Sequence, residues 1–292
     1  MKVTAHKSGG EFLDTAGDWL ERAESLNNLM LGIAARLAEE DKPSEAPAVM
    51  MTVSDKAGLA AACLMTPPRG VTLYAPRAGA AGEARAEAAL KALAGALEAG
   101  GHAVPECVGP AAAALAFAGL WAKRTGQGFT LRMAQRIYEL REVVFPTGVS
   151  GSARHARPED LDMLVEWRRQ YGVEIFGRHD HPDSREDIAQ RYIDGRLALL
   201  WENAGRCVSM AVVTRPTRHG IAVAGVYTPP GHRRRGYASA CVAELSRRQL
   251  DAGKQFCCLY TDLSNPTSNS IYQKIGYKPV ADSSHYAFTK EH

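Results

Sequence analysis

The chain contains 292 residues, of which 46% are hydrophobic and 23% charged, and its formal net charge at pH 7 is +3. This length allows one large domain or two ordinary ones, and the composition is typical of a soluble globular protein. So small a net charge gives no indication of a nucleic-acid partner. No apolar run approaches the roughly eighteen residues of a membrane helix, and residues 1–10 lack the apolar core of a signal peptide. The six cysteines form no C-x-x-C pair, which favours reduced thiols, and we therefore expect a cytoplasmic protein with no membrane association.

Apolar periodicity divides the first half of the chain into helices and strands. The predicted elements are, in chain order, a helix over 11–40, strands over 48–53, 59–65 and 71–74, helices over 82–101 and 110–125, and a strand over 131–140. Residues 146–152 carry the glycine, proline and serine residues that are typical of a linker. We therefore expect one domain over 1–148 and a second over 149–292.

After this linker the order of elements starts again. Helices are predicted over 158–171 and 187–193, followed by strands over 196–201 and 207–213. Thr214-Arg-Pro closes the last of these strands, as Thr66-Pro-Pro closes a strand of the first half. This weak internal repeat suggests that the first domain is a second copy of the same fold. An unrelated α+β domain is the alternative.

The most informative stretch runs from Val226 to Ala238, between a predicted buried strand over 221–226 and a predicted helix. Such a turn presents unpaired backbone N–H groups at the positive end of the helix dipole. Gly236 allows the backbone to approach a ligand closely, and three consecutive arginines add positive charge. These features predict a phosphate or pyrophosphate site. The candidate binding residues are Val226, Tyr227, Thr228, Arg233, Arg234, Arg235, Gly236, Tyr237 and Ala238.

Three phosphate-binding patterns can be compared with this turn. The P-loop pattern fails, because Tyr237-Ala238 stands where Lys-Ser/Thr is needed, and the Rossmann G-x-G-x-x-G is absent. The pattern that fits is Arg233-x-x-Gly236-x-Ala238. Taken alone it is short, and a solvated basic turn before a helix is the alternative.

A second block lies downstream of another predicted strand, over 255–261. Pro266 suits the first position of a short helix over 266–275, and Asn265 suits its N-cap. The block reads N-x-x-S-x-x-x-Y-x-x-x-G-Y, with its fixed positions at Asn265, Ser268, Tyr272, Gly276 and Tyr277. The two ordered blocks resemble the signature of the GNAT superfamily, the acetyl-CoA-dependent N-acetyltransferases. The resemblance covers roughly residues 150–290.

This resemblance implies a fold of the α/β (α+β) class. We expect two GNAT-like domains, each a mixed, mainly antiparallel twisted sheet flanked by helices. The first-half loop that corresponds to the phosphate turn is Ala75-Pro-Arg-Ala-Gly-Ala-Ala-Gly82. It lacks R-x-x-G-x-A and carries one arginine, so the domain over 1–148 is interpreted as a degenerate copy.

The resemblance also implies a reaction, in which acetyl-CoA is the co-substrate and a primary amine attacks its thioester directly. Tyr272 is the candidate acid for the departing thiolate, since a tyrosine hydroxyl stays protonated at neutral pH. A tyrosine packed between helix and sheet is the alternative reading. The backbone N–H near Val226 would polarise the thioester carbonyl. Asn265 and Ser268 are candidate coenzyme contacts, although an N-cap role explains Asn265 equally well.

The general base is not evident from the sequence. The strand over 221–228 contains no carboxylate, which leaves Glu174, Glu202, Asp262 or an ordered water. His179-Asp-His181, followed by Asp183, resembles a metal cluster, but this spacing is more typical of a polar loop. We expect no metal.

The acceptor amine cannot be identified from these residues, and a small molecule and a protein amine are both open, as is a homodimer. A coenzyme A-binding sensor or scaffold without turnover is the alternative function, favoured by the missing strand carboxylate. Nucleic-acid binding through Arg233, Arg234 and Arg235 is a third hypothesis, which the small net charge disfavours. We expect no nucleic-acid partner.

Overall fold

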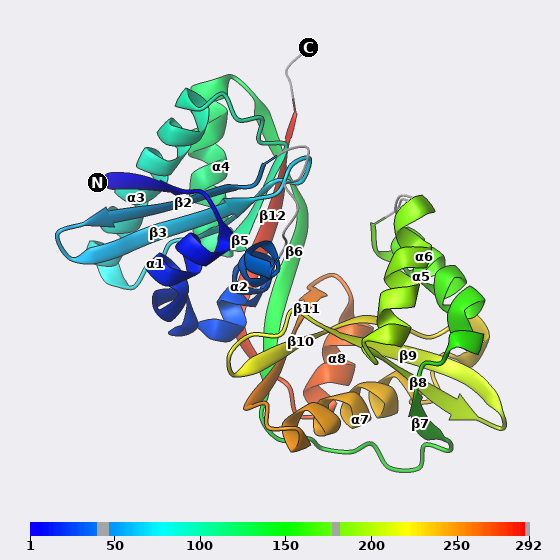
Figure 1. Ribbon diagram of the computed structural model, residues 1–292. Helices are drawn as coiled ribbons and strands as arrows, with labels where there is room; N and C mark the ends of the chain where they lie inside the picture. The colour runs from blue at the N-terminus through cyan, green and yellow to red at the C-terminus, as the bar shows by residue number, and fades with distance from the viewer. Residues whose placement is uncertain (40–46, 177–181, 290–292) are drawn as a thin grey trace. The chain divides into compact units, whose positions relative to one another are not determined.

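The computed structural model describes residues 1–39, 47–176 and 182–289, which form two compact units (Figure 1). Unit 1 comprises Met1–Ile137, Tyr260–Asn265 and Pro279–His292, and unit 2 comprises Tyr138–Leu259 and Pro266–Lys278. Within the described ranges, no helix combines the length and apolarity that crossing a bilayer requires. The boundary expected at 148/149 stays a prediction; the compact units differ from it in that two C-terminal segments lie in unit 1.

Unit 1 follows a β-α-α-β-β-β-α-β-α-β order. Its elements are β1 (Lys2–His6), α1 (Gly9–Glu21), α2 (Glu24–Glu39), β2 (Val49–Asp55), β3 (Gly58–Met65), β4 (Val71–Tyr74), α3 (Gly79–Ala99), β5 (Glu106–Pro110), α4 (Ala111–Thr125) and β6 (Gly128–Leu140). The last strand of the chain, β12 (Lys278–Thr289), joins this unit from Pro279 onward. The strand order is β1-β2-β3-β4-β5-β12-β6, and β4 and β5 run parallel.

Both faces of this sheet are covered, because successive side chains of a strand point to opposite faces. In β2, Val49, Met51 and Val53 belong to the core with α3 and α4, whereas Met50 belongs to the core with α1 and α2. Figure 1 shows these helix pairs on either side of the strands. Alanines at close-packed positions of α3, such as Ala89, allow this helix to lie near the sheet.

Unit 2 repeats the same order of elements. They are β7 (Ser152–His155), the 3₁₀ turn η1 (Pro158–Asp160), α5 (Leu161–Phe176), α6 (Pro182–Asp194), β8 (Ala198–Asn203), β9 (Arg206–Thr214), β10 (Gly220–Tyr227), the 3₁₀ turn η2 (Pro230–His232), α7 (Tyr237–Asp251), β11 (Phe256–Asp262) and α8 (Pro266–Lys274). The strand order is β11-β10-β9-β8-β7. One face packs against α7 and α8 through Val242 and Tyr272, and the other against α5 and α6 through Leu164 and Ile193.

The fold class expected from the sequence is confirmed: the sheets are mixed, mainly antiparallel and flanked by helices. Two details differ. The pattern over 11–40 forms two helices, because the chain turns at Arg22 and Ala23. The strands β1, β5, β7 and β12 were not predicted; the first three have only four or five residues, which carry too little periodicity to be recognised, whereas β12 has twelve.

Candidate functional site

The predicted phosphate turn follows a β-bulge in β10. Between Ala224 and Tyr227 the register with β9 shifts, so that Gly225 and Val226 face one residue of the partner strand. Gly225 has a φ of 57°, a conformation that favours glycine. A bulge bends its strand and re-aims the local backbone, and bulges are common beside active sites. Val226 therefore lies at the point where this strand changes direction.

Pairing between β10 and β11 ends shortly before this bulge. The two strands are parallel and are paired only over Gly220–Ala222 with Phe256–Cys258. In the described part of the chain, Val223–Tyr227 of β10 are not paired with β11. An unpaired strand edge offers N–H and C=O groups to an extended ligand. This edge leads directly into the predicted phosphate turn.

At the N-terminus of α7, Gly236 occupies the N-cap with a φ of 80°. A Cβ built on it would lie 2.7 Å from Cγ2 of Val149, so both the conformation and the space require glycine. The first helical hydrogen bond joins the N–H of Ala240 to the carbonyl of Gly236. The N–H groups that precede it have no acceptor within the helix and are positioned for an anion.

The side chain of Arg233 turns back onto the strand. Its Nε donates to the carbonyl of Thr228 at 2.8 Å, and its Nη2 lies 2.5 Å from Oε1 of Glu174. The guanidinium also lies over the ring of Tyr227, 5.9 Å from its centroid. Arg233 thus fixes the shape of the turn, and the free positive charge at the turn comes from the exposed Arg234 and Arg235.

Three further predicted contacts have buried or half-buried side chains. The hydroxyl of Tyr237, which is 5% exposed, accepts a hydrogen bond from Nδ2 of Asn203 at 2.7 Å. Thr228 Oγ1 lies 2.8 Å from Oγ of the buried Ser209. Ala238 is half-buried in the first turn of α7. For Tyr237 and Ala238, the group available to a ligand is the backbone N–H.

Tyr272 lies on the inner face of α8. Its ring is 8% exposed and packs edge-on against Tyr277, with centroids 5.9 Å apart. Burial raises the pKa of its hydroxyl above the usual value, with a further contribution from the nearby Tyr171. Such a hydroxyl stays protonated across the neutral range. Ser268 lies half-buried one turn earlier in the same helix. Asn265 is the last residue of the segment Tyr260–Asn265, which belongs to unit 1.

Tyr171 of α5 is a site residue that the sequence did not reveal. Burial raises the pKa of its hydroxyl, and that hydroxyl accepts a hydrogen bond from the backbone N–H of Gly225. It therefore contacts the bulge and is electrostatically coupled to Tyr272. The only local signal was its spacing four residues after the buried Trp167, which is also the spacing of an ordinary core position.

The three candidate bases are all engaged in other contacts. Glu174 forms the ion pair with Arg233. Glu202 accepts from Nε of Arg154 at 3.1 Å, within a cluster that includes Asp160. Asp262, in unit 1, accepts from both the N–H and the hydroxyl of Ser264 at 2.7 Å. Glu174 is the candidate nearest the turn.

No group of three or more histidine, cysteine, aspartate or glutamate side chains is arranged to hold a metal in the described residues. The pair His179 and His181 lies outside the described residues, so the sequence expectation stays a prediction there. All six cysteines are free thiols. Burial raises the pKa of Cys63, Cys107 and Cys257 to about 12, which keeps these three unreactive.

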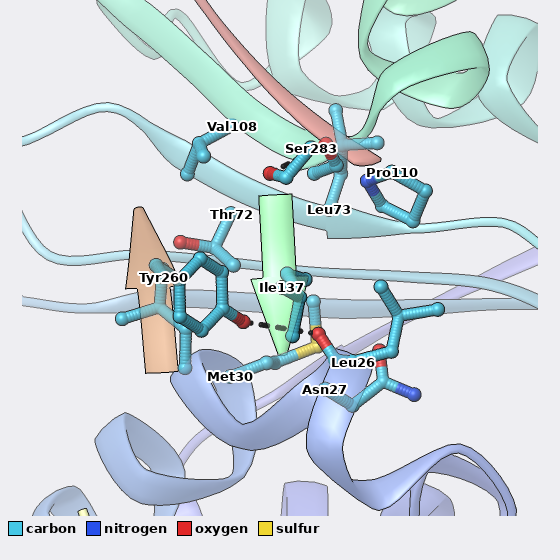
Figure 2. Close-up of a pocket in the computed structure, with 12 residues that line it drawn as sticks. Leu26, Asn27, Met30, Thr72, Leu73, Val108, Pro110, Ile137, Tyr260 and Ser283 are labelled. Atoms are coloured by element: carbon cyan, nitrogen blue, oxygen red, sulfur yellow. Dashed lines mark hydrogen bonds between the residues drawn. The ribbon is translucent and has the colours of Figure 1, made fainter. Parts of the chain in front are cut away.

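The corresponding strands of unit 1, β4 and β5, are paired only over Val71–Thr72 with Cys107–Val108, but they stay close beyond these residues. A Cβ built on Gly109 of β5 would lie 2.4 Å from the carbonyl oxygen of Leu73 in β4, and Ser283 Oγ donates to the carbonyl of Gly109 at 2.9 Å. Figure 2 shows a pocket beside these strands, where the Tyr260 hydroxyl donates to the carbonyl of Leu26 at 3.1 Å. Its volume of about 20 Å³ holds little more than one water. An extended coenzyme arm does not fit there.

Comparisons with known proteins agree with this geometry. Residues 208–286 match the family model described as FR47-like protein. A search of curated proteins returned no match. Similar solved structures include a GNAT-family acetyltransferase from Colwellia psychrerythraea, with 12% identity, a TM-score of 0.59 and 99% of this chain and 100% of that chain covered. A GCN5-related N-acetyltransferase from Sphaerobacter thermophilus has 16% identity, a TM-score of 0.63 and coverage of 97% and 94%.

A third similar structure is described as a tandem GNAT protein from the clavulanic acid biosynthesis pathway, without AcCoA. It has 11% identity and a TM-score of 0.54, and the match covers 100% of both chains. At such identities the likeness is one of fold. Together with the family match, it confirms the resemblance to the GNAT superfamily: the chain has the GNAT fold in tandem, and its residues 208–286 carry the FR47-like match.

Proposed function

We propose that the protein is an N-acetyltransferase that transfers the acetyl group of acetyl-CoA to a primary amine, with the coenzyme bound by unit 2. The observation that carries this proposal is the coincidence of three features: the bulge at Gly225 and Val226, the end of β10–β11 pairing, and the N-terminus of α7. An extended pantetheine arm can pair with the open strand edge. Its pyrophosphate can then meet the N–H groups of residues 234–238.

The residues around the bulge suit direct attack of an amine on a thioester. When bound, the coenzyme supplies an activated acetyl group. A C–N bond forms and the C–S bond breaks, so the carbonyl oxygen gains charge and the sulfur leaves as a thiolate. The backbone N–H near Val226 is the donor proposed for the oxygen. Tyr272, protonated at neutral pH, is the acid proposed for the sulfur, and Tyr171 holds the bulge through Gly225.

Glu174 is the base that we propose for the amine, directly or through water. Its ion pair with Arg233 places it beside the end of β10, and both side chains are partly exposed, at 43% and 42%. The acceptor is a small-molecule or protein amine that can reach this exposed carboxylate. We retain the boundary near 148/149 as a proposal about the ancestry of the two copies, with unit 1 as the degenerate one.

A coenzyme A-binding sensor without turnover is the second candidate function, because β10 contributes no carboxylate. Two measurements separate the candidates. Isothermal titration with acetyl-CoA tests binding, and release of free thiol across a panel of amines tests turnover. Binding together with amine-dependent thiol release supports the transferase, whereas binding without release for every amine supports the sensor. Absence of binding at millimolar acetyl-CoA would refute both.

A matched pair of glycine variants locates the coenzyme. Gly236→Ala forces alanine into a left-handed conformation, at a cost of about 1–2 kcal/mol, and brings its Cβ against Val149. The turn then shifts, and we expect the Kd for acetyl-CoA to rise about tenfold or more. Gly231→Ala lies in the same turn, with no atom within 4 Å of the added Cβ, and should bind as the wild type does. Equal affinities for the two variants would place the coenzyme elsewhere.

A further inference from the structure

A second cavity, of about 240 Å³, lies in unit 1 and is independent of the proposed acetyl transfer. It is formed between α2, the loop over residues 66–70 and strands β3, β4, β5, β6 and β12. Its volume is more than ten times the roughly 10–15 Å³ that one water needs. A ligand of several non-hydrogen atoms therefore fits, although not a coenzyme.

The wall formed by residues 66–70 depends on Gly70. A Cβ built on this residue would lie 2.0 Å from the carbonyl oxygen of Glu106, so only glycine lets the loop approach β5 this closely. The Gly70 N–H also donates to the Glu106 carboxylate. The wall is thus held in place, and Arg69 is fixed at the edge of the cavity by the hydrogen bond from its N–H to the carbonyl of Thr66, at 3.0 Å.

The charges around the cavity favour an anion. The Glu106 carboxylate is already compensated, since its Oε2 lies 2.9 Å from Nε2 of His285 and 3.2 Å from Nη1 of Arg132. The hydrogen bond from His285 and weaker electrostatic contributions from His285 and Arg132 outweigh the opposing effect of burial, and they hold the pKa of Glu106 below its usual value. Arg69 is exposed, lines the cavity and forms no ion pair within the described residues. It therefore supplies a positive charge at the cavity edge that no carboxylate of the described chain neutralises.

The remaining lining is largely apolar. Leu29 and Ile33 of α2 and Leu64 of β3 are among the lining residues, and Gln135 of β6 adds one amide. A lining that combines a charged side chain with aliphatic ones suits an amphipathic ligand of small size. We propose that this cavity binds a small aliphatic monocarboxylate, with its carboxylate on Arg69 and its hydrocarbon part against Leu29, Ile33 and Leu64.

Two probes of similar shape and opposite charge test this inference on the full-length protein. Isovalerate is expected to bind with a Kd of about 1 mM or tighter, and isoamylamine is expected not to bind. Isovalerate should also shift the imidazole resonances of His285 in NMR spectra, which locates it in the cavity. Binding of the amine alone, or of isovalerate without a shift at His285, would overturn the proposal.

Two arginine variants supply the second measurement. Arg69→Gln removes the exposed guanidinium and should weaken isovalerate binding about tenfold or more, because a charge-assisted bidentate contact is lost. Arg22→Gln changes an equally exposed arginine at the end of α1, outside the cavity, and should bind as the wild type does. Both variants are at the surface and should melt within a few degrees of the wild type. Undiminished binding by a folded Arg69→Gln variant would also overturn the proposal.

Discussion

The C-terminal strand β12 should stabilise unit 1, although it follows unit 2 in the sequence. Residues 283–287 pair antiparallel with residues 106–110 of β5. Tyr286, which is 9% exposed, packs in the core between the sheet and helices α3 and α4. Its ring also meets that of Phe129 edge-on, with centroids 5.6 Å apart. The perturbation that tests this role is Tyr286→Ala.

The expected cost can be worked from these contacts. Truncation of a buried aromatic ring typically costs about 3–5 kcal/mol, and this range already contains the ring–ring term of about 0.5–1.5 kcal/mol. For a domain of this size each kcal/mol lowers Tm by roughly 2–4 °C, so the unfolding of unit 1 should shift by roughly 6–20 °C. Ile275→Ala is the matched control, because Ile275 is 1% exposed in the core of unit 2 and lies only eleven residues earlier.

Hydrogen exchange read by mass spectrometry shows which unit each variant loosens. Tyr286→Ala should increase exchange in β2–β5, α3 and α4, whereas Ile275→Ala should increase it in α7, β9 and β10. The reasoning is refuted if Tyr286→Ala leaves exchange over residues 49–121 unchanged, or loosens unit 2 instead. Either result would mean that β12 belongs energetically to the unit that precedes it in the chain.

Three further predictions concern single side chains. Tyr272→Phe should lower the turnover number about 10²-fold at neutral pH, because the proposed acid is lost. Acetyl-CoA affinity and Tm should stay nearly unchanged, because the hydroxyl makes no hydrogen bond within the described residues. A variant that keeps more than half of wild-type turnover would show that Tyr272 has only a packing role. Glu174→Gln should lower kcat about 10²-fold or more, because a positioned base is lost, and an unchanged kcat would exclude Glu174 as the base. Asp55 accepts from both Nε and Nη2 of Arg85 at 2.8 Å and from the N–H of Ala57, and these bonds lower its pKa to about 2. Because the pKa of Asp55 is lower in the folded than in the unfolded protein, its ionised carboxylate stabilises the fold at pH values above the unfolded-state pKa. This stabilisation is lost as the pH falls toward 2, so Asp55→Asn should flatten the acid limb of the Tm–pH curve. An unaltered acid limb would contradict this prediction.

Local sequence patterns were sufficient for the helical regions, for most of the strands and for the turn at Gly236. The strand–turn–helix over 221–251 was predictable because its strand is apolar, its helix is periodic and its glycine is required by a positive φ. The strand over residues 279–289 was not predicted, and its place in unit 1 could not be, because alternation along a strand does not specify its partner. The orientation of the Arg233 side chain was also not predictable, because a sequence motif indicates the backbone conformation but not the contacts that orient a side chain. Tyr171 has the spacing of any core residue, so its contact with Gly225 required the fold.

An additional close approach between the two parallel strands of unit 1 distinguishes the two copies of the fold as ligand sites. Parallel central strands approach most closely where one of them carries glycine. In unit 2 this is Gly220, the first residue of β10, where an added Cβ would lie 2.2 Å from the Phe256 ring. The strands are thus held together at their start and stop pairing after Ala222. Unit 1 has the same approach at Gly70, directly before β4, where an added Cβ would lie 2.0 Å from the carbonyl oxygen of Glu106. It has a second one at Gly109, the fourth of five residues in β5, which keeps β4 and β5 close beyond their last paired residues, Thr72 and Val108. Replacing Gly109 with a larger residue would strain this contact without creating the turn that an anion needs, since residues 75–82 lack the arginines and the glycine-capped helix start of residues 233–237. Unit 1 differs from unit 2 in both respects, which is why we propose that unit 2 carries the transfer chemistry.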